Sequence, residues 1–180
     1  MIKPGKKVIL ESFEMDDWEC LYRWYYSGEY EDFFRDTPAV PGSDYFKRFS
    51  CLNNGFALKI KNHAQEIIGV ILVMDIKSNA QSACLGMIID KAHEGKGMGQ
   101  EATYLIVRHL FRDLGLRKLI IEIVDGRERL MKTAHLNGVN PEAIFKKEVK
   151  IDGEFKDIIR YAIFKEEAEE FFSKLEPVIL

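Results

Sequence analysis

The sequence predicts a domain of the α+β class, and three observations support this prediction. The 180 residues are enough for one substantial hydrophobic core, and no repeat, linker or low-complexity tract divides residues 1–180, so we expect a single domain. Hydrophobic residues make up 47% and charged residues 31% of the chain, which is an ordinary globular balance. Short apolar runs typical of strands alternate with runs of helical periodicity, in the order strand, helices, three strands, helix, strand, helix and two strands.

The N-terminal part of the chain predicts one strand followed by helices. Residues 8–10 form a short apolar run that is expected to be a strand. Asp16 or Asp17 is placed to cap a helix that Gly28 ends. Residues 29–49 combine aromatic and acidic side chains with proline and glycine breakers, so we expect a short helix, a loop and another short helix there.

The rest of the chain predicts strands and helices that are bounded by turn-forming residues. Gly115 is placed to stop the central helix, Asn137 and Gly138 close the next one, and Asp152 and Gly153 turn the chain between the last two strands. Gly69, inside a strand, indicates a bulge or close packing. The expected strands are 56–61, 67–76, 83–89, 118–124, 143–151 and 158–164, and the expected helices are 98–114, 127–136 and 165–175.

The most informative stretch joins the strand at residues 83–89 to the central helix through three glycines. Gly95, Gly97 and Gly99 stand at alternate positions just before the helical periodicity begins. Glycine lets the backbone approach a ligand closely, and the free N–H groups of the first helical turn favour negative charge. A strand, a glycine-rich turn and a helix start therefore predict a cradle for an anion, which we expect to be a phosphate.

The spacing of these glycines excludes one phosphate motif and weakens another. A P-loop needs G-x-x-x-x-G-K followed by Ser or Thr, but Lys96 lies between the glycines with no hydroxyl after it. A dinucleotide-binding turn needs G-x-G-x-x-G. Its sixth position is Gln100 when counted from Gly95, and Ala102 when counted from Gly97, so only the looser G-x-G-x-x-A form is met.

The run EGKGMG at residues 94–99, followed by Gln-Glu-Ala, more closely resembles the acetyl-CoA pyrophosphate loop of the GCN5-related N-acetyltransferases (GNAT), written Q/R-x-x-G-x-G/A. Gly97 and Gly99 take the glycine positions. Glu94 departs from the pattern, because a carboxylate there would repel phosphates. The segment IDGEFKD at residues 151–157 resembles the late hairpin of the branch that acetylates ribosomal-protein N termini, spermidine and related amines.

This resemblance covers nearly the whole chain and implies a fold, a co-substrate and a set of binding residues. The implied fold is a mixed, largely antiparallel sheet of about seven strands with helices on both faces. The implied co-substrate is acetyl-CoA, whose pantetheine would pair with the backbone of the strand before the loop, while backbone amides of the loop would face the pyrophosphate. The implied binding residues are Met87, Ile88, Ile89, Glu94, Gly95, Lys96, Gly97, Met98, Gly99, Gln100 and Arg127. Arg127 replaces an asparagine of the family, and either contacts the 3′-phosphate or faces solvent.

The resemblance also points to catalytic residues and shows one departure from the family. Glu122 stands where the family has its base and, by alternation, faces away from the side chains on either side of it; the alternative is a solvated or salt-bridged strand glutamate. The tyrosine that often protonates the leaving thiolate is replaced by Ala134. His135 is a candidate donor, although adjacent residues on a helix point about 100° apart. Water and Tyr161 are equal alternatives.

Composition limits the partners that the chain is expected to have. A net charge of −3 and a pI near 5.9 argue against nucleic acid. The absence of a long apolar run and of a signal-peptide pattern predicts a cytoplasmic protein without a membrane partner. The three cysteines include no C-x-x-C pair, so we expect neither disulfides nor a metal site. Residues 29–49 are either a packed flap or the pocket that receives an amine, and an exposed apolar rim at residues 18–49 would suit a homodimer.

Three functional hypotheses follow. The first is an acetyl-CoA-dependent N-acetyltransferase that acts on a primary amine, in a small molecule or at a peptide N terminus, by direct transfer without a covalent intermediate. The second is a non-catalytic acyl-CoA-binding regulatory module, which Glu94 and Ala134 would suit. The third is a nucleotide-binding oxidoreductase, which lacks support because the strand pattern has no repeated βαβ units.

Overall fold

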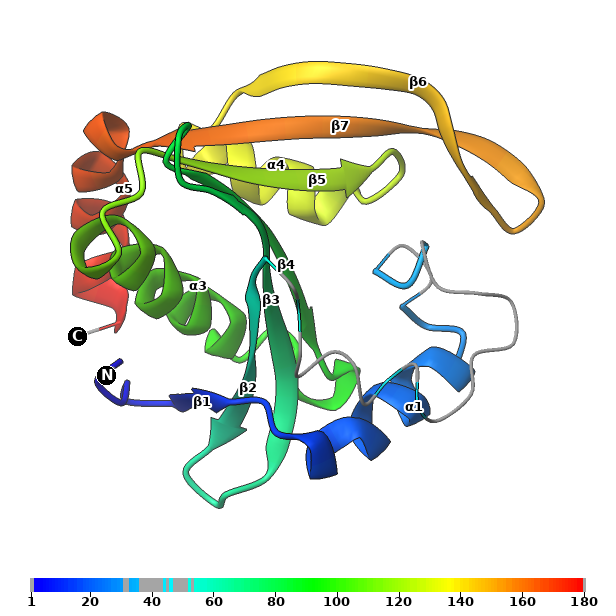
Figure 1. Ribbon diagram of the computed structural model, residues 1–180, viewed down its shortest axis with the longest axis horizontal. Coiled ribbons are helices and arrows are strands. Elements are labelled where there is room, and N and C mark those ends of the chain that lie inside the picture. Colours follow the sequence, from blue (N-terminus) through cyan, green and yellow to red (C-terminus); the bar gives the residue numbers. More distant parts are fainter. Residues whose placement is uncertain are drawn as a thin grey trace.

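The computed structural model describes residues 2–30, 33–35, 44, 46, 52 and 54–179, with side chains omitted at 171 and 174–179. The described residues form one seven-stranded mixed sheet in the order β1-β2-β3-β4-β5-β7-β6 (Figure 1). The strands are β1 (Val8–Ser12), β2 (Phe56–Asn62), β3 (Ile67–Lys77), β4 (Ser82–Ile89), β5 (Lys118–Val124), β6 (Pro141–Ile151) and β7 (Glu154–Phe164). The helices are α1 (Trp18–Tyr26), α3 (Met98–Arg108), α4 (Glu128–Leu136) and α5 (Lys165–Ile179), with short helical turns η1 (Met15–Asp17), η3 (Lys91–His93) and η4 (His109–Asp113). The predicted fold class and element order are therefore confirmed.

Some boundaries differ from the sequence predictions for identifiable reasons. β6 begins at Pro141, before the expected residue 143, because β6 is the last strand in the sheet order and a proline can start an edge strand. β7 begins at Glu154 because the tight turn at Asp152 pairs Ile151 with Glu154, so that exposed polar residues extend the ladder. Most of the helix–loop–helix expected at residues 29–49 lies outside the described residues.

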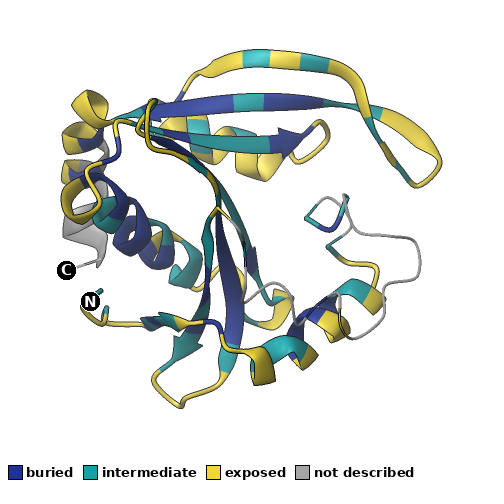
Figure 2. Cartoon of the chain, in the orientation of Figure 1, coloured by how far each residue is buried: buried dark blue, intermediate teal, exposed yellow. Residues whose placement is uncertain are grey.

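The sheet has a hydrophobic cluster on each face, which agrees with the uninterrupted burial of residues 68–73 on β3 (Figure 2). The larger cluster joins β1–β5 and β7 to α3, η4 and α5, with buried Tyr104, Leu110 and Phe172 among its members. The smaller cluster joins α1 to β2, β3 and β4, and includes buried Phe34 and Phe46. Figure 1 shows α3 and α1 on opposite sides of the strands β2–β4. No helix in the described part of the chain combines the length and apolar character needed to cross a membrane.

Gly69 illustrates how a single residue shapes the sheet. The register of β2 against β3 shifts between Ile60 and Lys61, directly beside Gly69. A Cβ at Gly69 would overlap the backbone carbonyl oxygen of Ile88 on the neighbouring strand β4. Both the bulge and the close packing predicted from this glycine are confirmed.

The strands β4 and β5 are the place where the sheet opens. The two strands are parallel. Residues 82–84 of β4 pair with residues 118–120 of β5, and the strands diverge beyond these residues. The remainder of β4 then pairs only with β3, and the remainder of β5 only with β7. The second half of β4 therefore has one edge whose backbone groups have no strand partner among the described residues. This edge leads directly to the glycine turn.

Candidate active site

The glycine turn forms the start of α3 in a conformation that only glycine adopts easily. Gly97 is the N-cap residue with φ of +76°, and Gly95 has φ of +73°. Gly99 packs against the end of β4, since a Cβ there would lie 3.3 Å from Cγ1 of Ile89. Gly97 has no side chain with which to cap the helix, so the N–H groups of the first turn need another acceptor. The turn thus has the geometry of the predicted anion cradle.

Lys7 is a cation at this turn that the sequence did not reveal. Its Nζ donates a hydrogen bond to the backbone oxygen of Lys96 at 3.0 Å and lies 2.7 Å from the position of a Cβ at Gly97. Glu101 holds this segment in place, because its Oε1 accepts hydrogen bonds from the backbone N–H groups of Lys7 at 2.8 Å and Val8 at 3.1 Å. Glu101 is only 1% exposed, which makes it the buried anchor between β1 and α3. Nothing local in the sequence links residues so far apart.

Glu94 was expected to repel phosphates, but its charge is directed elsewhere. Its carboxylate pairs with Arg129 on α4, with Oε2 and Nη1 2.9 Å apart. Lys96 folds back onto its own turn, where its Nζ donates to the backbone oxygen of Ala92 at 2.7 Å. The glycine turn therefore has two ammonium groups close to it, those of Lys7 and Lys96, and one carboxylate that is already paired.

The strand residues predicted to bind pantetheine line the open edge of β4, and their side chains point to both faces of the sheet. Met87 contacts Thr103 on α3, with Sδ 3.9 Å from Oγ1, and Ile89 packs on Gly99. Ile88 is buried in the smaller cluster beside α1. All three pair with β3 on one side, so only the backbone of the other edge faces the opening towards β5.

Glu122 lies on β5 and is held by two arginines that come from different segments. Nη2 of Arg35 lies 2.7 Å from Oε2, while Nε and Nη2 of Arg160 lie 3.1 and 2.7 Å from Oε1. Ile121 and Ile123 pack with the larger cluster, so Glu122 faces away from them, as the alternation predicted. Glu122 therefore makes ion pairs with both arginines, and its side chain is 21% exposed.

The described cysteine thiols near this region are not activated. Burial raises the pKa of the Cys84 thiol, and the negative charges of Asp75 and Glu122 raise it further. Burial raises the pKa of the Cys20 thiol to about 12. Because the thiolate is the nucleophilic form of cysteine, neither group is poised to attack a thioester. Both thiols are free, whereas Cys51 lies outside the described residues.

His135 does not lie on the face of the sheet that carries Glu122. It is exposed on α4, and its ring contacts the ring of Tyr161 edge-on, with centroids 6.2 Å apart. Tyr161 follows Arg160 on β7, so the two side chains point to opposite faces. The hydroxyl of Tyr161 is buried without a hydrogen-bond partner in the described part of the chain, and burial raises its pKa. The structure thus separates both candidate proton donors from Glu122.

Arg127 occupies a separate position at the N-cap of α4. It lines a cavity of about 250 Å³ together with Lys156 and Asp152, at the end where β5 meets the β6–β7 turn. A second cavity of about 400 Å³ lies between η1, α1 and the start of β3, and it is lined by Asp16, Asp17, Glu19, Cys20, Arg23, Glu66, Ile67 and Asp90. Neither cavity includes the glycine turn or Glu122, so the candidate site is the open edge between β4 and β5, with the segment 33–35 beside it.

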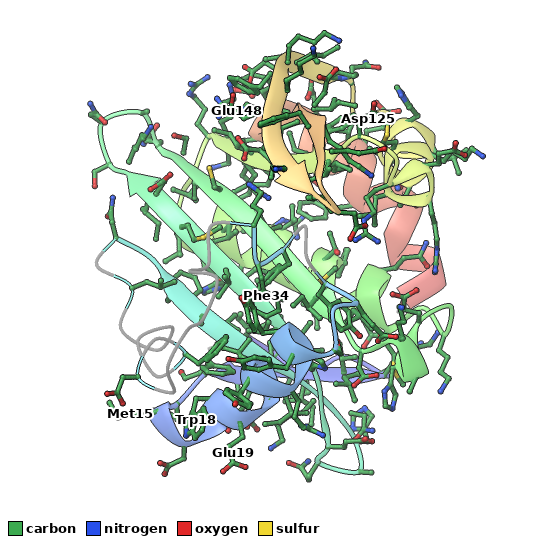
Figure 3. All side chains as sticks on the ribbon, turned by 90° about the vertical axis from the view of Figure 1, so that its right-hand side faces the viewer. Met15, Trp18, Glu19, Phe34, Asp125 and Glu148 are labelled. Carbon is green, nitrogen blue, oxygen red and sulfur yellow. The ribbon has the colours of Figure 1, made fainter. Side chains whose placement is uncertain are left out.

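The segment 33–35 covers the Glu122 face of this opening. The ring of Phe33 lies 3.5 Å from the position of a Cβ at Gly86 on β4. Phe34 is 5% exposed and packs with α1, as Figure 3 shows, and Arg35 reaches Glu122. Residues 29–49 were expected to form either a packed flap or an acceptor pocket. Within that segment, residues 33–35 lie against the sheet.

Comparisons with known proteins identify a family and a relative. The family profile described as "Acetyltransferase (GNAT) domain" matches residues 7–139. "Probable N-acetyltransferase YjcK" of Bacillus subtilis (strain 168) is 27% identical, in an alignment that covers 92% of this chain and 98% of the relative.

Two solved structures from Vibrio cholerae share the fold. A mutant of spermidine N-acetyltransferase SpeG has a TM-score of 0.78 and 17% identity, over 91% of this chain and 96% of the other. A dodecameric structure of spermidine N-acetyltransferase has a TM-score of 0.75 and 16% identity, over 91% of this chain and 97% of the other. At these identities the likeness shows the fold alone.

Proposed function

The chain belongs to the GNAT family of acetyltransferases and is an N-acetyltransferase, and from this premise we propose that it transfers an acetyl group from acetyl-CoA directly to a primary amine. The observation that carries the proposal is the opening between β4 and β5, because it joins the glycine turn to the carboxylate of Glu122. One end of this opening suits a phosphate and the other suits an amine. The acetyl group would pass between them.

The residues around the glycine turn fit acetyl-CoA. The uncapped first turn of α3 provides N–H donors for a pyrophosphate, and Lys7 and Lys96 add positive charge. The free edge of β4 at Met87–Ile89 offers backbone groups to the amides of pantetheine. Arg127 lines its own cavity and is proposed to meet the 3′-phosphate. When bound, the thioester of acetyl-CoA supplies an acetyl group that is activated towards nucleophiles.

Glu122 is proposed to accept the proton of the amine through a water molecule. A carboxylate has about four lone-pair positions, and the two arginines occupy three of those on Glu122. The remaining position is on Oε2, beside Arg35. The arginines fix the orientation of the carboxylate, so that this position is held ready for the water that contacts the amine.

Transfer is proposed to be direct, with both substrates bound at once. The amine nitrogen forms a bond to the acetyl carbon as the carbon–sulfur bond breaks, and the amine proton passes to Glu122. The raised pKa values of Cys20 and Cys84 support this route, because neither thiol suits a covalent acetyl-enzyme. Ala134 cannot donate a proton, so we propose that solvent water protonates the departing thiolate.

We further propose that the chain pairs with a second copy of itself. Met15, Tyr22 and Tyr26 are 53%, 40% and 52% exposed on η1 and α1, and the rings of Tyr22 and Tyr26 lie 4.5 Å apart. A relative of the same fold is described as dodecameric. Light scattering on the purified protein tests this proposal, and a strictly monomeric mass at micromolar concentration would contradict it. The expected cytoplasmic location stays a prediction.

The proposed function is tested by comparing thermal unfolding of the purified chain with acetyl-CoA, NADH and ATP. A ligand that binds only the folded state stabilises it by about 2.7 kcal/mol at roughly a hundredfold excess over its dissociation constant. We expect stabilisation by acetyl-CoA alone. Stabilisation by NADH or ATP instead would overturn the proposal, whereas stabilisation by acetyl-CoA with no acetylation of any amine would indicate the non-catalytic binding module.

A further inference from the structure

Gly86 stands where the free edge of β4 begins. Up to Cys84 the strand pairs with β5 on this side, and beyond Cys84 the same side faces the opening. In the proposed complex, the pantetheine arm runs along Met87–Ile89 from a pyrophosphate at the glycine turn, so the thioester at the end of the arm lies beside Gly86. The residues around Gly86 are therefore the residues around the acyl group.

The bare side of Gly86 opens to the face of the sheet that carries Glu122. Side chains alternate along a strand, so Cys84, Gly86 and Ile88 share one face. Cys84 lies near Glu122, and Ile88 belongs to the smaller cluster. Glu122, however, lies on β5, across the opening from β4. The space beside Gly86 is thus on the acyl side of the reaction, and the space beside Glu122 is on the amine side.

The space beside Gly86 is bounded by Phe33 and Met74 at the distance of a methyl group. The position of a Cβ at Gly86 lies 3.5 Å from Cε2 and 4.0 Å from Cδ2 of Phe33, and 3.7 Å from Cε of Met74. Distances of this size between carbon atoms are favourable van der Waals contacts. One carbon atom therefore fits in this direction, whereas a second carbon directed at the same atoms would overlap the ring or the thioether.

Packing behind Phe33 and Met74 holds both side chains in place. The ring of Phe33 contacts the ring of Phe34 edge-on, with centroids 5.1 Å apart and an interplanar angle of 82°. Phe34 is 5% exposed and in turn contacts Tyr25 on α1 edge-on, at 5.5 Å. Met74 lies on β3 and packs with the smaller cluster. We therefore expect the space to keep its size when a ligand enters.

We propose that Phe33 and Met74 determine which acyl-CoA this chain uses, because they limit the acyl group beside Gly86 to an acetyl group. The inference rests on the proposed function, which places the thioester at the end of the free edge of β4. The methyl of the acetyl group contacts the ring of Phe33 and Cε of Met74, and this apolar lining suits a group without polar atoms. A propionyl or butyryl group adds carbon atoms that meet the same lining, and it is disfavoured.

Titration calorimetry on the full chain with CoA, acetyl-CoA, propionyl-CoA and butyryl-CoA tests this proposal without an acceptor amine. CoA has no acyl group, so its dissociation constant reports on the rest of the site. We expect acetyl-CoA to bind at least as tightly as CoA. Butyryl-CoA should bind about tenfold more weakly than acetyl-CoA, with propionyl-CoA between them, because each added methylene must displace packed side chains.

Variants of the lining connect the preference to these two side chains. Phe33→Ala and Met74→Ala each enlarge the space, and each should bring the affinity for butyryl-CoA within about threefold of that for acetyl-CoA. The affinity for CoA should stay within about twofold of the wild-type value, because the turn and the edge of β4 are unchanged. Phe155→Ala is the control, because it removes the same ring from a position on β7 that is 65% exposed. This control should leave the acyl preference unchanged.

Gly86→Ala makes the opposite change, since its methyl group fills the space. Gly86 lies within β4 and its φ is not positive, so alanine is compatible with the backbone there. Acetyl-CoA should bind this variant about tenfold more weakly than CoA does, because the acetyl methyl and the alanine methyl compete for one place. In the double variant Gly86→Ala/Phe33→Ala, the affinity for acetyl-CoA should be partly restored, because the two residues are in contact.

The outcomes separate a failure of this inference from a failure of the proposed function. Equal affinity of the wild-type chain for acetyl-CoA and butyryl-CoA would overturn the inference. A preference for the acetyl group that survives in both Phe33→Ala and Met74→Ala, or unchanged binding of acetyl-CoA by Gly86→Ala, would overturn it as well. In each of these cases CoA still binds, and the co-substrate site stands. Absence of binding of both CoA and acetyl-CoA by the wild-type chain would instead overturn the proposed function.

Discussion

The glycine turn and the Glu122 face lie along the same opening in the sheet, but they are built in different ways. The turn consists of contiguous residues, and its chemistry comes from backbone N–H groups that two glycines with positive φ expose. The Glu122 face consists of three side chains from the segment 33–35, β5 and β7, and its chemistry comes from their charges. A backbone site tolerates changes in side chains but not in φ, whereas a side-chain site has the opposite sensitivity.

The largest expected effect follows from adding a side chain to the turn. In Gly97→Glu, a carboxylate would stand in the anion cradle and its Cβ would meet Nζ of Lys7, so acetyl-CoA should bind at least about a hundredfold more weakly. Gly153→Glu is the matched control, because Gly153 has φ of +82° but no atom within 4 Å of an added Cβ. Each variant should lose about 1–2 kcal/mol of stability from the strained backbone conformation. Titration calorimetry should show weaker binding of acetyl-CoA only in Gly97→Glu. Equal affinity of both variants for acetyl-CoA would contradict the assignment of the co-substrate to the glycine turn.

The next effect concerns Glu122. Glu122→Gln cannot accept the amine proton and removes the carboxylate that Arg35 and Arg160 share, so kcat should fall about tenfold or more. Stabilisation by acetyl-CoA should not change, because the turn keeps its backbone. Glu142→Gln is the control. It removes a carboxylate on β6 that pairs with Lys118, a residue of the strand β5 that also carries Glu122, and it should leave kcat within about twofold. Unchanged turnover in Glu122→Gln would remove this residue from the mechanism.

The same contrast explains what the sequence could predict. Strand and helix order followed from apolar periodicity, and the turn followed from three alternate glycines, since both signals are local. Glu122 could be identified only through a family resemblance. The prediction that its side chain faces away from those of Ile121 and Ile123 is confirmed. The family itself could be identified from the loop and from the element order, and its profile matches residues 7–139.

The long-range partners could not be predicted, because no local pattern specifies them. Arg35 and Arg160 stand 87 and 38 residues from Glu122, and Lys7 stands 89 residues from Lys96. Their meeting depends on the sheet order and on the buried carboxylate of Glu101, which anchors β1 to α3. A glutamate on the apolar face of a helix is one sequence signal that could have suggested such an anchor.

A smaller effect is expected from Lys7, which reaches the turn from the segment directly before β1. Lys7→Met should weaken acetyl-CoA binding about two- to fivefold, because an exposed charge contributes modestly in water. The loss should shrink as salt is raised, because salt screens exposed charges. Lys3→Met removes another exposed lysine of the same segment and should not change the affinity. An equal effect of both variants would show that Lys7 acts only through net charge.

The smallest effect is expected at Cys84, although this thiol lies close to Glu122. Cys84→Ala should leave kcat within about twofold, since burial raises the pKa of the thiol and keeps it protonated at neutral pH. Mass spectrometry of the wild-type chain incubated with acetyl-CoA alone should find no acetyl group on Cys84. An acetylated thiol that forms and disappears at the rate of turnover would indicate a covalent route.

The central claim is that acetyl-CoA at the turn and an amine at the Glu122 face are bound at the same time. Initial rates measured over a matrix of acetyl-CoA and acceptor concentrations test it most directly, with the amine that is acetylated fastest as the acceptor. Direct transfer in a ternary complex predicts double-reciprocal lines that intersect, whichever substrate is varied. Parallel lines, the pattern of a covalent acetyl-enzyme, would contradict the account.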